Sequence, residues 1–130
     1  MSSQTRTAKD TSTPTTISRT IAIPFITDDE IDKALDYLRD NARDAAQAKA
    51  NRVYVEEYRK VIKAQLMKEH GTMSAVLQER EAYSDPRYVQ HLEAIKQAVE
   101  LDEGHRFLRA AADAKIEAWR TQSSNTRARV

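Results

Sequence analysis

Apolar residues recur at alternating three- and four-residue steps through most of the chain, which is the spacing of α-helices packed along a shared seam. In the first half, the seam passes through Ile31, Leu35, Leu38, Ala42 and Ala45. Continued in phase it would pass through Lys49 and Arg52, which are charged. The apolar pattern resumes in a shifted phase at Ala48, Val55, Tyr58, Ile62 and Leu66. The shift predicts a stutter, a local unwinding of the supercoil, just after Ala45.

Capping signals set the ends of three predicted helices. Thr27 followed by Glu30 is a capping box, and no Gly or Pro interrupts the chain from there until Gly71, which predicts one helix over 28–70. A short helix is expected within 72–84. Asp85-Pro86 then places an N-cap before a proline at the first helical position, which predicts a second long helix running to Gln122. Its expected seam is Tyr88, Leu92, Ile95, Val99, Leu108, Ala111 or Ala112, Ile116 and Trp119.

These elements predict an all-α fold: a long antiparallel, coiled-coil-like helical hairpin over residues 28–122 with a short connecting helix. If His70 lies near Pro86, the pairing places Leu38 beside Trp119 and Lys63 beside Glu93. A single two-helix hairpin buries little apolar surface. We therefore expect self-association into a homo-oligomer, a dimer or a larger bundle.

The two ends of the chain differ from this domain in composition. Residues 1–20 contain eleven Ser or Thr and few apolar groups, so we expect a disordered tail. Residues 21–27 form a β-prone apolar patch around Pro24, which favours an extended arm over a central strand. We expect residues 123–130 to form a flexible basic C-terminus.

Composition narrows the class of protein. The chain has 130 residues, room for one domain, and 21 Lys or Arg against 20 Asp or Glu, so bulk charge implies no partner. The absence of cysteine excludes disulfides, a thiolate nucleophile and cysteine-type zinc sites. No apolar run approaches the length of a bilayer span and the start of the chain lacks a secretory h-region, so we expect no membrane contact and an intracellular, host-cytoplasmic location.

The sequence contains few residues in arrangements that would support catalysis or metal binding. His70, His91 and His105 each have a nearby acid, but none belongs to a set of three or four convergent ligands. The sequence contains no nucleophile elbow, P-loop or HExxH motif. We predict a protein that is not an enzyme and holds no metal or cofactor.

Positive charge is concentrated in two places, which suits phosphate groups. Residues 49–68 carry a local balance of +4 and residues 115–130 one of +3. The candidate nucleic-acid-binding residues are Lys49, Arg52, Arg59, Lys60, Lys63, Arg120, Arg127 and Arg129. A solvated flank of a coiled coil explains the same charges, and both interpretations stay open.

Four aromatic residues are candidate partner contacts. Tyr54 and Tyr83 lie outside the predicted seams, and Phe25 lies in the arm. Trp119 precedes Arg120, and Trp and Arg dominate the centres of protein interfaces. Trp119 fits equally well as the residue that closes the hairpin over Leu38.

Three segments carry a resemblance to a known group of proteins. They are Tyr54–Lys60 with Lys63-Ala64, then Gln78–Tyr88, and Ile116–Gln122 with Asn125 and Arg127. Over about residues 48–128 the chain resembles a family of small, mostly uncharacterised helical proteins of tailed bacteriophages. The resemblance implies a setting among recombination and replication genes, beside single-strand-binding or annealing proteins, and it supplies no catalytic residues.

Three functions follow as hypotheses. The first is a non-enzymatic bacteriophage accessory of DNA recombination or replication that binds DNA, or a DNA-bound protein, through a basic helical face. The second is a protein-interaction module that docks on a host or phage protein and modulates it. The third is a structural component of the virion.

Overall fold

The computed structural model describes residues 25–129, and this part of the chain consists of four helices with no strand. They are α1 (Asp28–Asp40), α2 (Ala42–Glu69), α3 (Ala75–Ser84) and α4 (Pro86–Ala128). The predicted all-α class is confirmed. The predicted tail, residues 1–20, and residues 21–24 of the predicted arm lie outside the described residues, as does Val130.

The helix starts follow the capping signals. Thr27 accepts a hydrogen bond from the backbone N–H of Glu30, whose carboxylate accepts one from the N–H of Thr27, so the capping box is formed. Ser74 caps α3. Asp85 caps α4 by accepting from the N–H of Arg87, with Pro86 at the first helical position.

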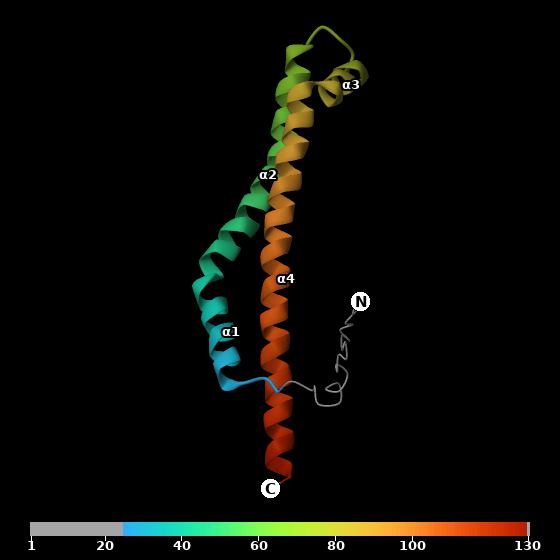
Figure 1. Cartoon of the computed structure of the whole chain (residues 1–130). Coiled ribbons are helices and arrows are strands. Elements are labelled where there is room, and N and C mark those ends of the chain that lie inside the picture. Colours follow the sequence, from blue (N-terminus) through green and yellow to red (C-terminus); the bar gives the residue numbers. More distant parts are fainter. Residues whose placement is uncertain (1–24, 130) are drawn as a thin grey trace, which may run out of the picture.

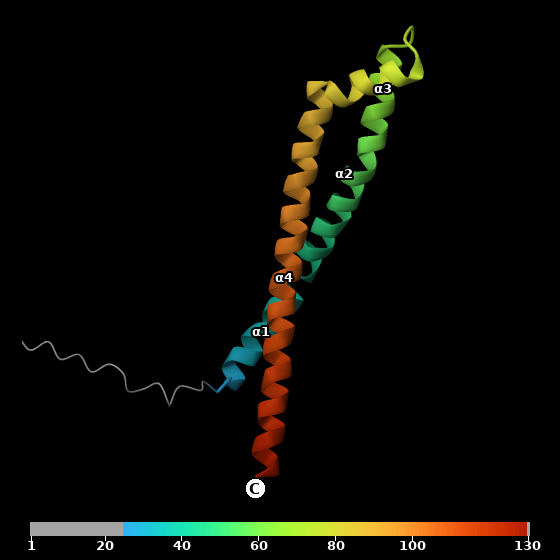
Figure 2. The same cartoon turned by 90° about the vertical axis from the view of Figure 1, so that its right-hand side faces the viewer.

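The long helix α4 is a rod along which the other helices are arranged (Figure 1). α2 contacts the part of α4 near its start, and α1 contacts the part nearer its end; both run in the direction opposite to α4. α3 packs mainly on α2 at the top of the molecule. Figure 2 shows α3 crossing between the upper ends of α2 and α4, which are spread apart there.

The first long helix is interrupted, but not where the apolar pattern predicts. The helix breaks at Asn41, with φ −102° and ψ 4°, rather than unwinding after Ala45. Both the backbone N–H and the side-chain amide of Asn41 donate to the carbonyl of Tyr37, each at 3.0 Å. The backbone bond is the usual helical one, whereas the side-chain amide competes for the same carbonyl, and this competition accounts for the break.

The inner seam of α1 and α2, meaning the residues turned toward α4, runs without a change of phase across this break. Its residues are buried or half-buried at steps of three and four: Ile31, Ala34, Leu38, Asn41, Ala45, Ala48, Arg52 and Val55. The prediction placed Ile31, Leu38, Ala45, Ala48 and Val55 correctly, and it was wrong by one position at Leu35 and Ala42, where Ala34 and Asn41 are turned inward instead. Ala34 is buried, whereas the larger Leu35 is 49% exposed. Small alanines let the helices approach closely, and the charge of Arg52 is met by acids on α4.

The inner seam of α4 differs from its prediction in the same way. It passes through Tyr88, His91, Ile95, Ala98, Asp102, His105, Arg109, Ala112, Ile116 and Trp119. Leu92 was expected in this seam and is 42% exposed, while its neighbour His91 reaches the carbonyl of Val55 at 2.6 Å. The polar residues His91 and Arg109 thus occupy places that the apolar pattern assigned to leucine, and Ala98 occupies the place of Val99.

The predicted pairing of residues between the long helices is also wrong. Lys63 pairs with Glu79 of α3 at 2.8 Å and not with Glu93. The indole N–H of Trp119 donates to Asp28 at 3.1 Å and does not close over Leu38. The short helix expected within 72–84 is present as α3, but the prediction placed His70 near Pro86, whereas α3 lies between the long helices and changes where they meet.

The C-terminal end of α4 extends past the predicted boundary. The helix continues beyond Gln122 to Ala128, so residues 123–128 are helical. The hydroxyls of Thr121 and Thr126 donate to backbone carbonyls four residues earlier, which keeps these polar residues compatible with the helix. The Gln122 side chain also exchanges two hydrogen bonds with the backbone of Ile26, at 2.9 and 2.8 Å, and ties the segment before α1 to α4.

The apolar core lies at the top of the molecule. Leu66, Ala82 and Tyr88 are buried there, one each from α2, α3 and α4, with Ile62 and Met67 packed against them. Below this cluster, the buried residues are isolated positions along the seam. The helices are therefore joined by apolar packing at one end and by a narrower, partly polar seam elsewhere.

Candidate interaction surfaces

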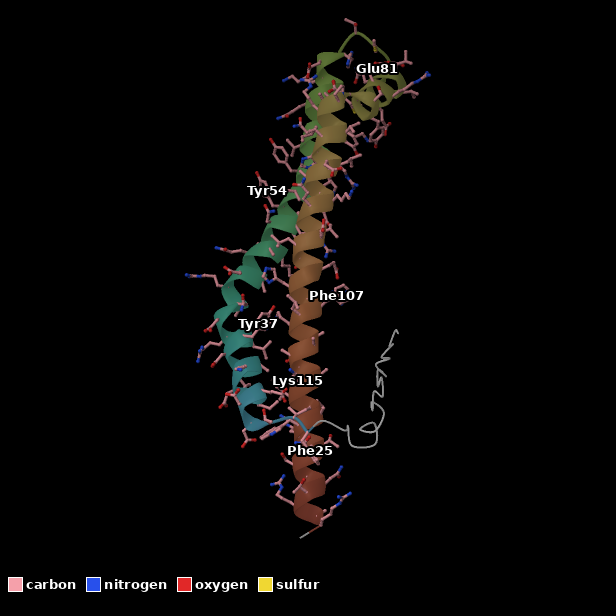
Figure 3. The ribbon with its side chains drawn as sticks, in the orientation of Figure 1. Phe25, Tyr37, Tyr54, Glu81, Phe107 and Lys115 are labelled. Carbon is pink, nitrogen blue, oxygen red and sulfur yellow. The ribbon has the colours of Figure 1, made fainter. Side chains whose placement is uncertain are left out.

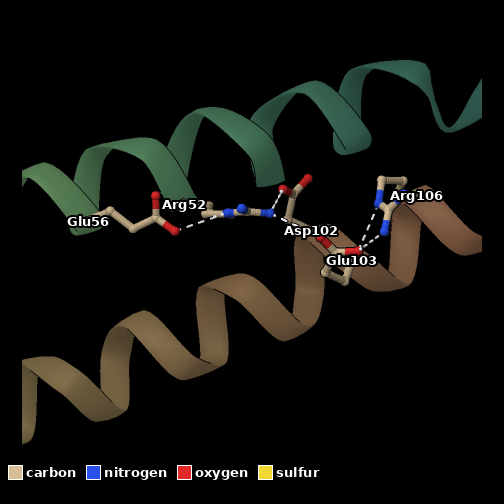
Figure 4. A network of polar contacts seen from close by, with 5 residues as sticks. All are labelled: Arg52, Glu56, Asp102, Glu103 and Arg106. Carbon is tan, nitrogen blue, oxygen red and sulfur yellow. Dashed lines mark hydrogen bonds and ion pairs between the residues drawn. The ribbon is translucent and has the colours of Figure 1, made fainter.

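A network of charged side chains spans α2 and α4 midway along their contact (Figure 4). Arg52 donates to Glu56 on its own helix at 3.1 Å, and to Asp102 and Glu103 on α4 at 2.9 and 3.2 Å. Glu103 is also paired with Arg106 at 2.7 Å. Because the Asp102 side chain is only 15% exposed, its ion pair with Arg52 lies mostly out of solvent.

The network borders a groove of about 650 Å³ between the two helices, which we call the polar groove. It is lined by Ala42, Ala45, Ala46, Lys49, Arg52, Val53, Glu56, Asp102, Glu103, His105, Arg106 and Arg109. The ring nitrogen Nδ1 of His105 is buried without a hydrogen-bond partner. Nowhere in residues 25–129 do three or more His, Asp or Glu side chains form a group that could hold a metal ion. Arg52, Glu56, Asp102, Glu103 and Arg106 of the polar groove bind one another, and this network joins α2 to α4.

Three carboxylates are held in their charged form by neighbouring cations. Hydrogen bonds from Arg106, and then from Arg52, lower the pKa of Glu103. Lys63 lowers the pKa of Glu79 through the bond that joins α2 to α3. The Arg87 side chain and backbone N–H lower the pKa of Asp85 at the start of α4. Charged hydrogen bonds of this kind link helices, or cap them, at three separate points.

The eight candidate nucleic-acid-binding residues divide into two groups. Four of them form ion pairs within the chain: Arg52, Lys60 with Glu57, Lys63 with Glu79, and Arg120 with Glu117. The other four, Lys49, Arg59, Arg127 and Arg129, make no ion pair with any residue that the structure describes. The α2 residues and the end of α4 lie at different levels of the molecule, so the fold does not gather all eight on one surface (Figure 1).

The four candidate partner residues are also dispersed. Phe25 is 70% exposed, and Tyr54 is exposed with its ring stacked on Tyr58 at 5.7 Å between centroids (Figure 3). Tyr83 packs edge-on against the core residue Tyr88 at 5.2 Å, with the Lys63 ammonium 4.8 Å from its ring centre. Trp119 is half-buried in the α1–α4 contact. These residues form no common surface.

Two apolar surfaces were not predicted from the sequence, although one of their residues, Tyr83, was a candidate partner contact. The head surface consists of Met73, Val76, Leu77 and Tyr83, at and beside α3, with exposed fractions of 40–75%. The α4 stripe consists of Leu101, Gly104, Leu108 and Ala111, with Phe107 on its flank. The sequence does contain a signal for both surfaces: once the inner seam is placed correctly, these large apolar residues have no position in it and must face solvent.

Comparison with protein-family models, with curated proteins and with solved structures finds no match to this chain. The resemblance to phage helical proteins therefore stays a prediction. The helices of residues 25–129 include none with an apolar stretch long enough to cross a bilayer.

Proposed function

We propose that this chain is a non-enzymatic protein-interaction module, an accessory of bacteriophage DNA recombination or replication, that docks on another protein rather than acting on a small molecule. One observation carries the proposal: the head surface leaves large apolar side chains in solvent, while half of the cations expected to bind DNA are used in ion pairs inside the chain. Exposed apolar groups that cluster at one place are typical of protein-binding sites. The phage setting rests on the sequence resemblance.

The head surface is held in a fixed position. Val76 is 75% exposed and Leu77 44% exposed on the outer side of α3, while Ala82 on its inner side is completely buried. The Lys63–Glu79 ion pair at 2.8 Å fastens α3 to α2. A short helix with its inner side anchored presents its outer side chains with little loss of conformational freedom on binding, which favours affinity.

Charge next to the head surface indicates the chemistry of the partner. Arg80 follows Val76 by one helical turn and is exposed, and it makes no ion pair with any residue in 25–129. We infer that the partner presents an apolar patch bordered by carboxylates, as on a DNA-bound protein of the same pathway. We further propose that the helices form a coiled-coil-like hairpin that carries the head surface at its tip.

Site-specific photo-crosslinking in phage-infected cells tests this function. A photoreactive residue at position 76 is expected to crosslink one defined protein, and nuclease treatment should leave the crosslink unchanged. The same residue at position 35, which is also exposed but lies on α1, serves as the control and should not capture that protein. Equal capture from both positions, or loss of the crosslink with nuclease, would contradict protein docking at the head surface.

Direct DNA binding is the second candidate, because Lys49, Arg59, Arg127 and Arg129 have no ion-pair partner among the described residues. Gel-shift titration at two salt concentrations tests it. If these cations contact phosphates, wild-type binding should weaken steeply with salt, and Arg127→Ala with Arg129→Ala should remove it. Failure of the wild-type chain to shift DNA at low salt would exclude this candidate. Lys63 is unsuitable as a test position because its loss would loosen α3.

A further inference from the structure

The α4 stripe is an apolar surface that stays exposed in the part of the chain that the structure describes. Leu101 and Leu108 are 56% and 58% exposed, and Gly104 lies between them one turn from each. Two depressions, of about 500 Å³ over Gly104 and about 480 Å³ farther along the helix, are both lined by Leu108. The second depression is also lined by Ala34 and Tyr37 of α1, so the surface widens where α1 meets α4.

We propose that the α4 stripe binds the α4 stripe of a second copy of this chain, with the two helices antiparallel. This goes beyond the proposed function, because it uses a different surface and a different partner. The stripe positions recur at steps of three and four, so two copies can pack as a second seam on the side of α4 that does not face α2.

Size complementarity selects the pairing of the two copies. When Leu108 of one chain is placed opposite Gly104 of the other, the antiparallel spacing brings Leu101 opposite Ala111. Each leucine then faces a small residue, and the symmetry repeats both contacts. A Cβ added at Gly104 would meet nothing within 4 Å, so the space over this residue is open to a side chain from outside.

Charge complementarity selects the antiparallel direction. Glu100 lies toward the start of the stripe and Lys115 toward its end, and neither forms an ion pair with a residue that the structure describes. In the antiparallel pair, Lys115 of one chain lies within a helical turn of Glu100 of the other. In a parallel pair each charge would face its own copy, which is repulsive.

Phe107 supplies an aromatic contact beside the symmetry axis of the pair. It points away from α1 and α2 and is 62% exposed, with the Arg106 guanidinium 4.8 Å from its ring centre (Figure 3). Because Phe107 is near the midpoint of the stripe, the two copies of this ring approach each other across the axis. Aromatic residues near the centre of an interface carry a large share of binding energy.

Sedimentation equilibrium of the full chain tests the proposal. We expect a dimer for the wild type, and at least about a tenfold weaker association for Leu108→Asp with unchanged helix content. Val89→Asp is the matched control, since Val89 is 54% exposed but lies 12 residues before Leu101, outside the stripe, and it should leave the dimer intact. A monomeric wild type, or equal weakening by both variants, would overturn the proposal.

The variant Gly104→Leu distinguishes the proposed pairing from non-specific hydrophobic association. The open space around Gly104 allows the monomer to accept a leucine, which also makes α4 more apolar. The proposed dimer should nevertheless dissociate, because Leu108 of the second copy occupies that space. Stronger association of this variant would contradict the proposed pairing.

Cysteine crosslinking fixes the direction, since the chain has no native cysteine. A mixture of Leu101→Cys and Ala111→Cys chains should form a mixed disulfide dimer, and Leu101→Cys alone should not. Efficient disulfides in Leu101→Cys alone would overturn the antiparallel direction. The head-surface crosslinking described above is unaffected by these results, so either proposal can fail without the other.

Discussion

The top of the molecule and the middle of its long helical contact are held together by different chemistry. At the top, Leu66, Ala82 and Tyr88 form a buried apolar cluster to which three helices contribute. In the middle, the facing positions of α2 and α4 include Arg52 and Asp102, and the other positions are small or half-buried. Apolar packing stabilises the top, whereas the middle depends on ion pairs and on small or half-buried residues.

The contrast shows where this chain gains stability and where it gains specificity. Apolar burial is non-directional and contributes most of the free energy of folding. An inner ion pair contributes less net free energy, because both charges lose solvation, but it fixes which residues face one another. The polar seam therefore sets the alignment of α2 and α4, and it leaves the leucines of α4 available for other contacts.

The largest effect should come from the top. Leu66→Ala removes a side chain that is 3% exposed, and we expect a loss of about 2–5 kcal/mol in the free energy of unfolding. Leu35→Ala is the matched control, because Leu35 is 49% exposed, and it should cost less than about 1 kcal/mol. Urea denaturation measures both, and comparable losses would remove the distinction between core and surface leucines.

Mutations in the middle of the α2–α4 contact should reduce stability less than mutations at the top. The effects of mutating two residues of the charged network should depend on each other. Arg52→Ala leaves Glu56, Asp102 and Glu103 without their shared cation, so we expect the melting temperature to fall by several degrees. Asp102→Ala made together with Arg52→Ala should cost less than the two single losses combined. Arg39→Ala, which removes two exposed surface ion pairs, should change little. If the losses of stability from the two single mutations simply add in the double mutant, residues 52 and 102 are not coupled, and their ion pair does not set the alignment of α2 and α4.

Acid should produce the smallest of these effects. The lowered pKa values of Glu79, Asp85 and Glu103 mean that their stabilising effect is present above their unfolded pKa, about 4, and is lost as the pH falls through the folded values. The urea midpoint should therefore be constant from pH 7 to about 5 and decline below about 4. Glu79→Gln combined with Glu103→Gln should flatten that decline. A midpoint that rises in acid would have the opposite sign to this linkage.

Much of the fold follows from local signals in the sequence. The capping box at Thr27 and the Asp85-Pro86 start of α4 are formed as predicted, because caps depend on a few adjacent residues. The phase of the seam could not be obtained in this way. The apolar pattern favours Leu35 and Leu92, whereas the fold turns Ala34 and His91 inward, because charge pairing across helices and close approach at alanine depend on residues distant in the sequence.

The candidate sites were predicted less well for the same reason. Whether a cation is free to bind phosphate depends on acids that folding brings near it, and Lys63 meets Glu79 only because α3 folds onto α2. The composition gives the number of charged residues but does not show which of them form ion pairs with one another. The exposed leucines of α4 were hidden in the sequence because the predicted seam had already used Leu108 as a core position.

Thiol labelling of single-cysteine variants tests the central claim most directly, since the chain lacks cysteine and each introduced thiol reports its own exposure. Cysteines are placed at positions 34 and 35 of α1 and labelled in native protein. The account predicts slow labelling at position 34, which faces α4, and fast labelling at position 35, which faces solvent. Fast labelling at position 34 with protection at position 35 would contradict it.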